Sequence, residues 1–92
     1  MQNKISLSSI FQKKAIAMKK SELKSRLARG GSFTVDALFF KFSELVVCAK
    51  SAVEGNSTLT IKNADTLLVS EIDALCEHAS GHVNFLDVKF ED

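Results

Sequence analysis

The residues best suited to metal or nucleophile chemistry are Cys76, His78 and His82, with Cys48 as a fourth candidate from another segment. Cysteine and histidine are the usual ligands of zinc. On a helix, however, Cys76 and His78 project about 200° apart. Gly81 also ends the helix before His82 can pair with His78. We therefore predict no metal site, and we interpret His78 as a last-turn imidazole that complements the helix dipole.

A Cys-His nucleophile would need an acid behind the histidine, and the spacing does not select among Asp73, Glu77 and Asp87. The short run Gly30-Gly31-Ser32 has helix N-terminus character but lacks the glycine pattern and lysine of a phosphate loop. We predict a non-catalytic protein without catalytic residues or a cofactor.

Charge is distributed unevenly along the chain, although the net charge is only +1. Residues 1–29 carry eight basic side chains against one acid, whereas residues 30–92 carry four against ten. A flexible basic segment suits a phosphate backbone. Nucleic-acid binding is therefore the alternative function, with these candidate residues: Lys13, Lys14, Lys19, Lys20, Lys24, Arg26 and Arg29.

The stretch from Ser57 to Phe90 predicts a parallel strand–helix–strand unit. Residues 58–62 alternate polar and apolar side chains, as a strand with one buried face does. Residues 63–66 supply turn and capping chemistry, and the next apolar residues recur at helical spacing up to Gly81. Residues 83–90 return as an extended apolar run whose alternation switches, which predicts either a β-bulge at Phe85-Leu86 or a strand covered on both faces.

Two helices are expected before this unit. A capping box at Ser9 to Gln12 begins the first, which is either two pieces with Ser21 as a second N-cap or one helix between two apolar surfaces. Ser32 or Thr34 caps the second, whose apolar stripe runs from Val35 to Val53. The predicted fold is α+β in the order α-α-β-α-β, with helices on one side of a small sheet. A basic helical segment (1–29) and an α-β-α-β core (32–92) form one domain.

Two strands make an incomplete sheet. Either residues 3–7 add a third strand, or a homodimer closes the edge. Apolar side chains beyond what each element needs predict a protein interface at Phe40, Val47, Leu86, Val88 and Phe90. The leading functional prediction is a protein-interaction or regulatory module that associates with itself or another protein.

The composition indicates a protein of a reducing compartment. The chain has 46% apolar and 25% charged residues, two cysteines without disulfide-type spacing, and no apolar run near the roughly 18 residues that span a bilayer. We expect a cytoplasmic protein without membrane partners. The alternative is a matrix protein, if residues 1–29 act as a transit sequence.

Overall fold

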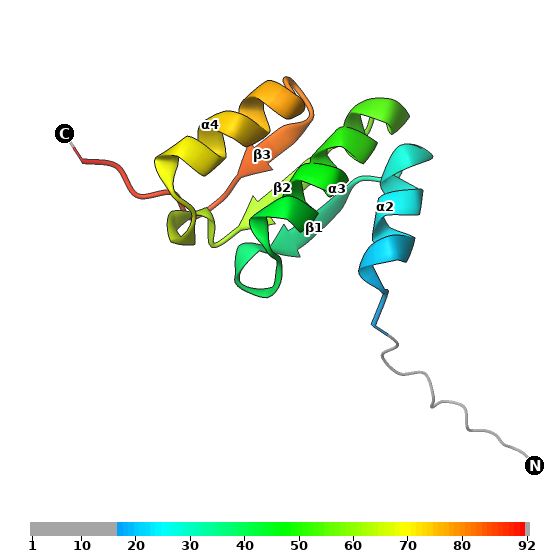
Figure 1. The fold of residues 1–92 in the computed structure, drawn as a ribbon, viewed down its shortest axis with the longest axis horizontal. Helices are drawn as coiled ribbons and strands as arrows, with labels where there is room; N and C mark the ends of the chain where they lie inside the picture. Colours follow the sequence, from blue (N-terminus) through cyan, green and yellow to red (C-terminus); the bar gives the residue numbers. More distant parts are fainter. Residues whose placement is uncertain (1–16, 92) are drawn as a thin grey trace, which may run out of the picture.

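The computed structural model describes residues 17–91, which form one parallel sheet with helices packed on one of its faces (Figure 1). The strand order is β1-β2-β3, so neighbours in the chain are also neighbours in the sheet. The elements of this part of the chain are α2 (Lys20–Ala28), β1 (Phe33–Asp36), the 3₁₀ turn η1 (Ala37–Phe39), α3 (Phe42–Gly55), β2 (Leu59–Lys62), the 3₁₀ turn η2 (Ala64–Thr66), α4 (Val69–His78) and β3 (Val83–Phe85).

The predicted α+β class is confirmed, and the order α-α-β-α-β is kept with one strand added between its first two helices. That strand, β1, occupies the stretch where the second helix was expected to begin, so the prediction of a helix from Val35 is wrong. Asp36 ends β1 and caps η1 by accepting a hydrogen bond from the Leu38 amide at 2.9 Å. The helix proper begins only at Phe42. Residues 3–7 and the expected cap at Ser9 lie outside the described residues.

The final strand is shorter than the sequence predicts. Only Val83–Phe85 is strand, although Leu86 still donates its amide to the Ile61 carbonyl at 2.9 Å. Asp87 then takes a positive φ of 69°, which turns the chain away from the sheet. The segment after Asp87 leaves the body beside α4 (Figure 1, red).

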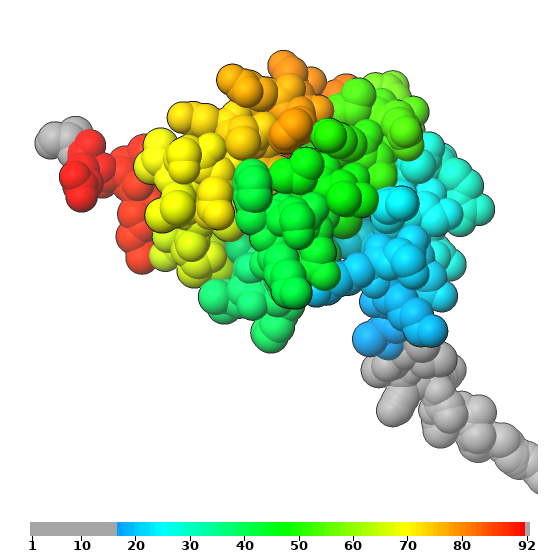
Figure 2. Space-filling view, in the orientation of Figure 1, coloured from blue at the N-terminus to red at the C-terminus, as the bar shows by residue number. Residues whose placement is uncertain are grey.

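The sheet has one apolar and one polar face. Phe33, Leu59 and Val83 are in register and face the helices, as do the residues two positions later in each strand. Thr60 and its neighbours in register, Thr34 and Asn84, lie on the opposite face. The helices therefore cover a single face and form the surface seen in Figure 2.

A short sequence repeat begins each α-helix of residues 17–91. Ser21-Glu22, Ser43-Glu44 and Ser70-Glu71 occupy the same two helical positions. Each glutamate accepts a hydrogen bond from the amide three residues earlier, at 3.0, 2.8 and 2.9 Å respectively. This satisfies one orphan donor at each helix start. The described part of the chain is thus a stack of three α-β units: α2–β1, α3–β2 and α4–β3.

Side chains of Asp and Asn join the units where the strands end. Asn63 donates its side-chain amide to Asp36 at 2.9 Å, and its backbone amide donates to the Asp87 carboxylate at the same distance. Asn63 has a φ of 56°, a left-handed conformation that asparagine tolerates well. The three strand ends are therefore held in one line of polar contacts.

The first two units are in unusually close contact. The Ser57 hydroxyl, which is buried, donates to the Leu27 carbonyl in the last turn of α2 at 2.8 Å. Gly55, at the end of α3, lies directly against the backbone of Leu27 and Ala28. The buried core is made mainly of small and aliphatic side chains from all three units: Leu23, Leu27, Val35, Ala37, Leu45, Cys48, Ala49, Ala52, Leu59, Ile61, Leu75 and Ala79.

Candidate functional site

An apolar groove lies at the outer end of the stack, between α4, β3 and the segment that follows. It encloses about 570 Å³. Leu86 and Phe90 are 45% and 88% exposed. The groove is mainly apolar and is lined by Ile72, Cys76, Val83, Asn84, Phe85, Leu86, Asp87, Val88 and Phe90. An apolar groove of this kind is typical of an interaction surface.

Comparison of equivalent positions shows why this end is open. Leu45 and Ala49 of α3 are fully buried, and the residues at the same positions of α4 are Ile72 and Cys76. Ile72 is only half-buried and Cys76 is exposed. The strands differ in the same way, since β2 buries its apolar pair completely whereas β3 leaves its pair half-buried. The middle unit has a neighbour on each side, and the α4–β3 unit has one among residues 17–91.

The structure separates the five residues of the predicted interface. Leu86, Val88 and Phe90 lie together in the groove at the outer end. Phe40 is half-buried and packs against the core under Lys20, with the Lys20 Nζ 4.6 Å from its ring centre. Val47 is 45% exposed on α3. Three of the five predicted residues therefore share one surface, and the other two lie elsewhere.

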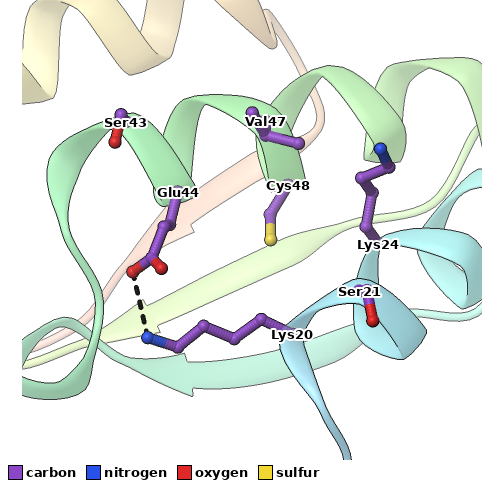
Figure 3. Close-up of a pocket in the computed structure, with 7 residues that line it drawn as sticks. All are labelled: Lys20, Ser21, Lys24, Ser43, Glu44, Val47 and Cys48. Atoms are coloured by element: carbon purple, nitrogen blue, oxygen red, sulfur yellow. Dashed lines mark hydrogen bonds and ion pairs between the residues drawn. The ribbon is translucent and has the colours of Figure 1, made fainter.

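A second groove, of about 280 Å³, runs between α2 and α3 (Figure 3). Lys20 reaches across it, pairs with the Glu44 carboxylate at 2.9 Å and donates to the Phe39 carbonyl at 2.7 Å. The Lys41 amide and Lys20 together hold the pKa of Glu44 below its usual value. Burial raises the pKa of the Cys48 thiol, which keeps it protonated and unreactive. This groove is thus an internal junction of two units.

Acid is expected to destabilise the protein through Glu44 and Asp36. Hydrogen bonds from Asn63 and the Leu38 amide lower the pKa of Asp36. Both carboxyl groups therefore bind protons less readily when folded than when unfolded. Their contribution is present above the unfolded pKa of about 4 and is lost as the pH falls through the folded pKa. The free energy of unfolding, measured by urea titration, should stay level from about pH 7 to 5 and decline below about pH 4.

Glu44→Gln is expected to reduce that acid dependence, with Glu54→Gln on the same helix as the control. Stability that is unchanged down to about pH 3 in the wild type would contradict this role of the two carboxylates.

Of the seven basic residues of the predicted nucleic-acid site, the structure describes five. Lys13 and Lys14 lie outside the described residues. Lys19, Lys20, Lys24, Arg26 and Arg29 are exposed on or next to α2. Lys20 is engaged with Glu44, as described above. Arg26 and Arg29 donate to carbonyls of their own helix at 3.2 and 3.4 Å.

The residues considered for metal or nucleophile chemistry are dispersed. Cys76 is exposed on α4, and His78 lies in the last turn of that helix. The His82 Nδ1 lies 2.9 Å from the Ser57 carbonyl, which joins the loops before β2 and β3. No three His, Cys, Asp or Glu side chains of residues 17–91 lie together as a metal site would require.

Residues 17–91 thus form a small stack of α-β units in which no described segment fills the groove at the α4–β3 end. Within the described part of the chain, no helix combines the length and apolar character needed to cross a bilayer. Comparison of the chain with protein-family models, curated proteins and solved structures finds no match.

Proposed function

We propose that this chain is a non-catalytic protein-interaction module that associates with copies of itself through the α4–β3 end. The supporting observation is the contrast between equivalent positions. Leu45 and Ala49 are completely covered by neighbouring units, whereas Ile72 and Cys76 line an open groove. A partner that fills the groove would remove this apolar surface from water, which is the main favourable term in protein association.

The exposed apolar surface continues from α4 onto the segment after β3. Leu86 and Phe90 place exposed apolar side chains beside the outer edge of β3, with which no other strand of residues 17–91 pairs. Free strand edges readily pair with another chain because their amide and carbonyl groups are unpaired. The end of the stack thus offers both apolar burial and backbone hydrogen bonds.

Nucleic-acid binding through α2 is a second candidate function. It is supported by the exposure of Lys24 and Arg26 on α2 and of Arg29 directly after it. The two functions differ in their response to salt, because phosphate contacts weaken steeply with ionic strength whereas apolar burial does not.

Sedimentation equilibrium of the full chain over a range of concentrations tests the leading proposal. The average mass should rise above 10.1 kDa with concentration, at both low and physiological salt. Leu86→Ser combined with Phe90→Ser should weaken association about tenfold or more, since two apolar side chains leave the interface.

The matched control removes two exposed apolar side chains from the middle helix instead. Val47→Ser with Val53→Ser, at positions 45% and 43% exposed, should leave the association unchanged. A wild-type chain that stays monomeric at every concentration would refute self-association.

A further inference from the structure

The two ends of the stack carry opposite charges on the sides that face outward. Lys20 and Lys24 of α2 face α3 across their common groove. Alignment on the Ser-Glu pairs places Val69 and Asp73 at the same positions of α4, followed one turn later by Glu77. These positions face away from α3, toward the place of a next helix. Asp73 and Glu77 are both exposed there.

The other end of the stack is basic on the corresponding side. α3 faces α2 through a row that includes Glu44 and Cys48, and buried Ser51 continues it. The equivalent row consists of Glu22 and Arg26 of α2 and of Arg29, the residue after the helix, all exposed. It therefore carries two positive charges against one negative charge, and the Glu22 carboxylate accepts the Lys19 amide. The hydrogen bonds of the two arginines to carbonyls of α2 use one donor of each guanidinium, which leaves donors for a carboxylate.

The free strand edges are also compatible with each other. Phe33 donates its amide to the Thr58 carbonyl, so Thr34 directs its backbone groups to the outer edge of β1. On β3, the His82 carbonyl and Leu86 amide bond to β2, so the residues between them alternate toward the outer edge. Among residues 17–91, no strand pairs with either outer edge. Joining β3 of one copy to β1 of another would therefore extend a sheet whose strands are all parallel.

We propose that a second copy docks head to tail, with its α2–β1 unit continuing the stack at the α4–β3 end of the first. Asp73 and Glu77 then face Arg26 and Arg29, and β1 becomes a fourth parallel strand. This inference rests on the proposed self-association and specifies its geometry. A symmetric dimer through β3 would instead bring the acidic side of α4 toward that of its copy, and like charges across an interface are costly.

Head-to-tail docking leaves one free end on each side of every pair, so it predicts assembly beyond the dimer. It also assigns apolar contacts to the β1 end, where Met18 is 46% exposed and Phe33 is half-buried beside a groove of about 290 Å³. Those side chains would lie against the apolar groove of the neighbouring copy.

Two variants of the full chain test the geometry, each blocking one end. Thr34→Pro removes an amide from the free edge of β1, a position where proline is tolerated. Asp73→Arg with Glu77→Arg opposes the arginines of α2. In sedimentation velocity, each variant alone should remain at the monomer mass of 10.1 kDa. Their 1:1 mixture has one intact interface, so it should form a dimer and stop there.

Control variants distinguish a loss of docking from a loss of folding. Thr34→Val retains the edge amide and should assemble like the wild type. Glu54→Arg changes a charge in the same sense on α3, away from the proposed contact, and should also assemble. Wild-type assembly together with unaffected Thr34→Pro, or a mixture that stays monomeric, would overturn head-to-tail docking while leaving self-association in place.

A charge swap uses exposed side chains alone and provides a second test. Arg26→Glu with Arg29→Glu should lose assembly by itself, about tenfold or more in association constant. Mixed with the Asp73→Arg, Glu77→Arg variant, it should recover assembly beyond the dimer, because every end again meets opposite charge. A mixture that recovers nothing would reject the charge pairing. A monomeric wild type would refute the proposed function itself.

Discussion

Replacement of Gly55 by alanine is expected to lower the free energy of unfolding by about 3 kcal/mol. A Cβ at this position would overlap the Leu27 carbonyl oxygen and lie 2.7 Å from the Ala28 carbonyl carbon. Both neighbours are backbone atoms of α2, so they cannot move aside as a flexible side chain would. The α2–β1 unit must shift away from α3, which would also stretch the 2.8 Å hydrogen bond from Ser57 to Leu27.

Urea unfolding followed by circular dichroism measures this loss, and Gly81→Ala is its control. Gly81 has a φ of 82° with nothing within 4 Å of an added Cβ, so its cost is backbone strain alone, about 1–2 kcal/mol. At Gly55, which lies within α3, helix propensity alone would favour alanine over glycine by about 1 kcal/mol. A Gly55→Ala protein as stable as the wild type would show that α2 does not approach α3 this closely.

Truncation of the apolar residue after the Ser-Glu pair should cost more stability in α3 than in α4. Leu45→Ala is expected to cost about 3 kcal/mol, because Leu45 is 0% exposed between two neighbouring units and its loss leaves a cavity. Ile72→Ala, at the same position of α4, should cost only about 1 kcal/mol in the monomer since Ile72 is half-buried.

Both variants are compared by chemical unfolding at a concentration where the chain is monomeric. Equal losses at the two positions would mean that the end of the stack is as well covered as its middle, contrary to the open groove. In the self-associated state, Ile72→Ala should additionally weaken association, whereas Leu45→Ala should not.

The sequence was sufficient for the second half of the fold. Alternation at 58–62, turn chemistry at Asn63 and the glycine at 81 define β2, η2 and the end of α4 because each of these signals is local. Gly81 does adopt a positive φ, as expected from its place after the helix. The predicted parallel unit is confirmed as β2–α4–β3.

The first strand was missed because two periodicities overlap there. Phe33 and Val35 give only one alternation, while Val35 and Leu38 continue the helical spacing of α3. A strand of four residues has too few side chains for its own pattern to prevail. The recurrence of Ser-Glu at 21, 43 and 70 was the signal that would have indicated three equivalent units.

Part of the candidate surface could be predicted from the sequence. Leu86, Val88 and Phe90 exceed what one strand can bury, and the structure places them in the same groove. Phe40 and Lys20 could not be assigned in this way, because their contact joins residues twenty positions apart and depends on how α2 is oriented. Charge patterning likewise shows that α2 is basic but not which side of it faces outward.

The sequential strand order also determines how this chain can fold. Each unit pairs only with the units beside it, so strand pairing joins residues 26 and 24 positions apart, as in Phe33 with Leu59 and Leu59 with Val83. Short loop closures of this kind favour rapid folding, and a stack of neighbours can nucleate on any adjacent pair. We expect the α3–β2 unit, which has two neighbours among residues 17–91, to act as the folding nucleus on which the outer units assemble.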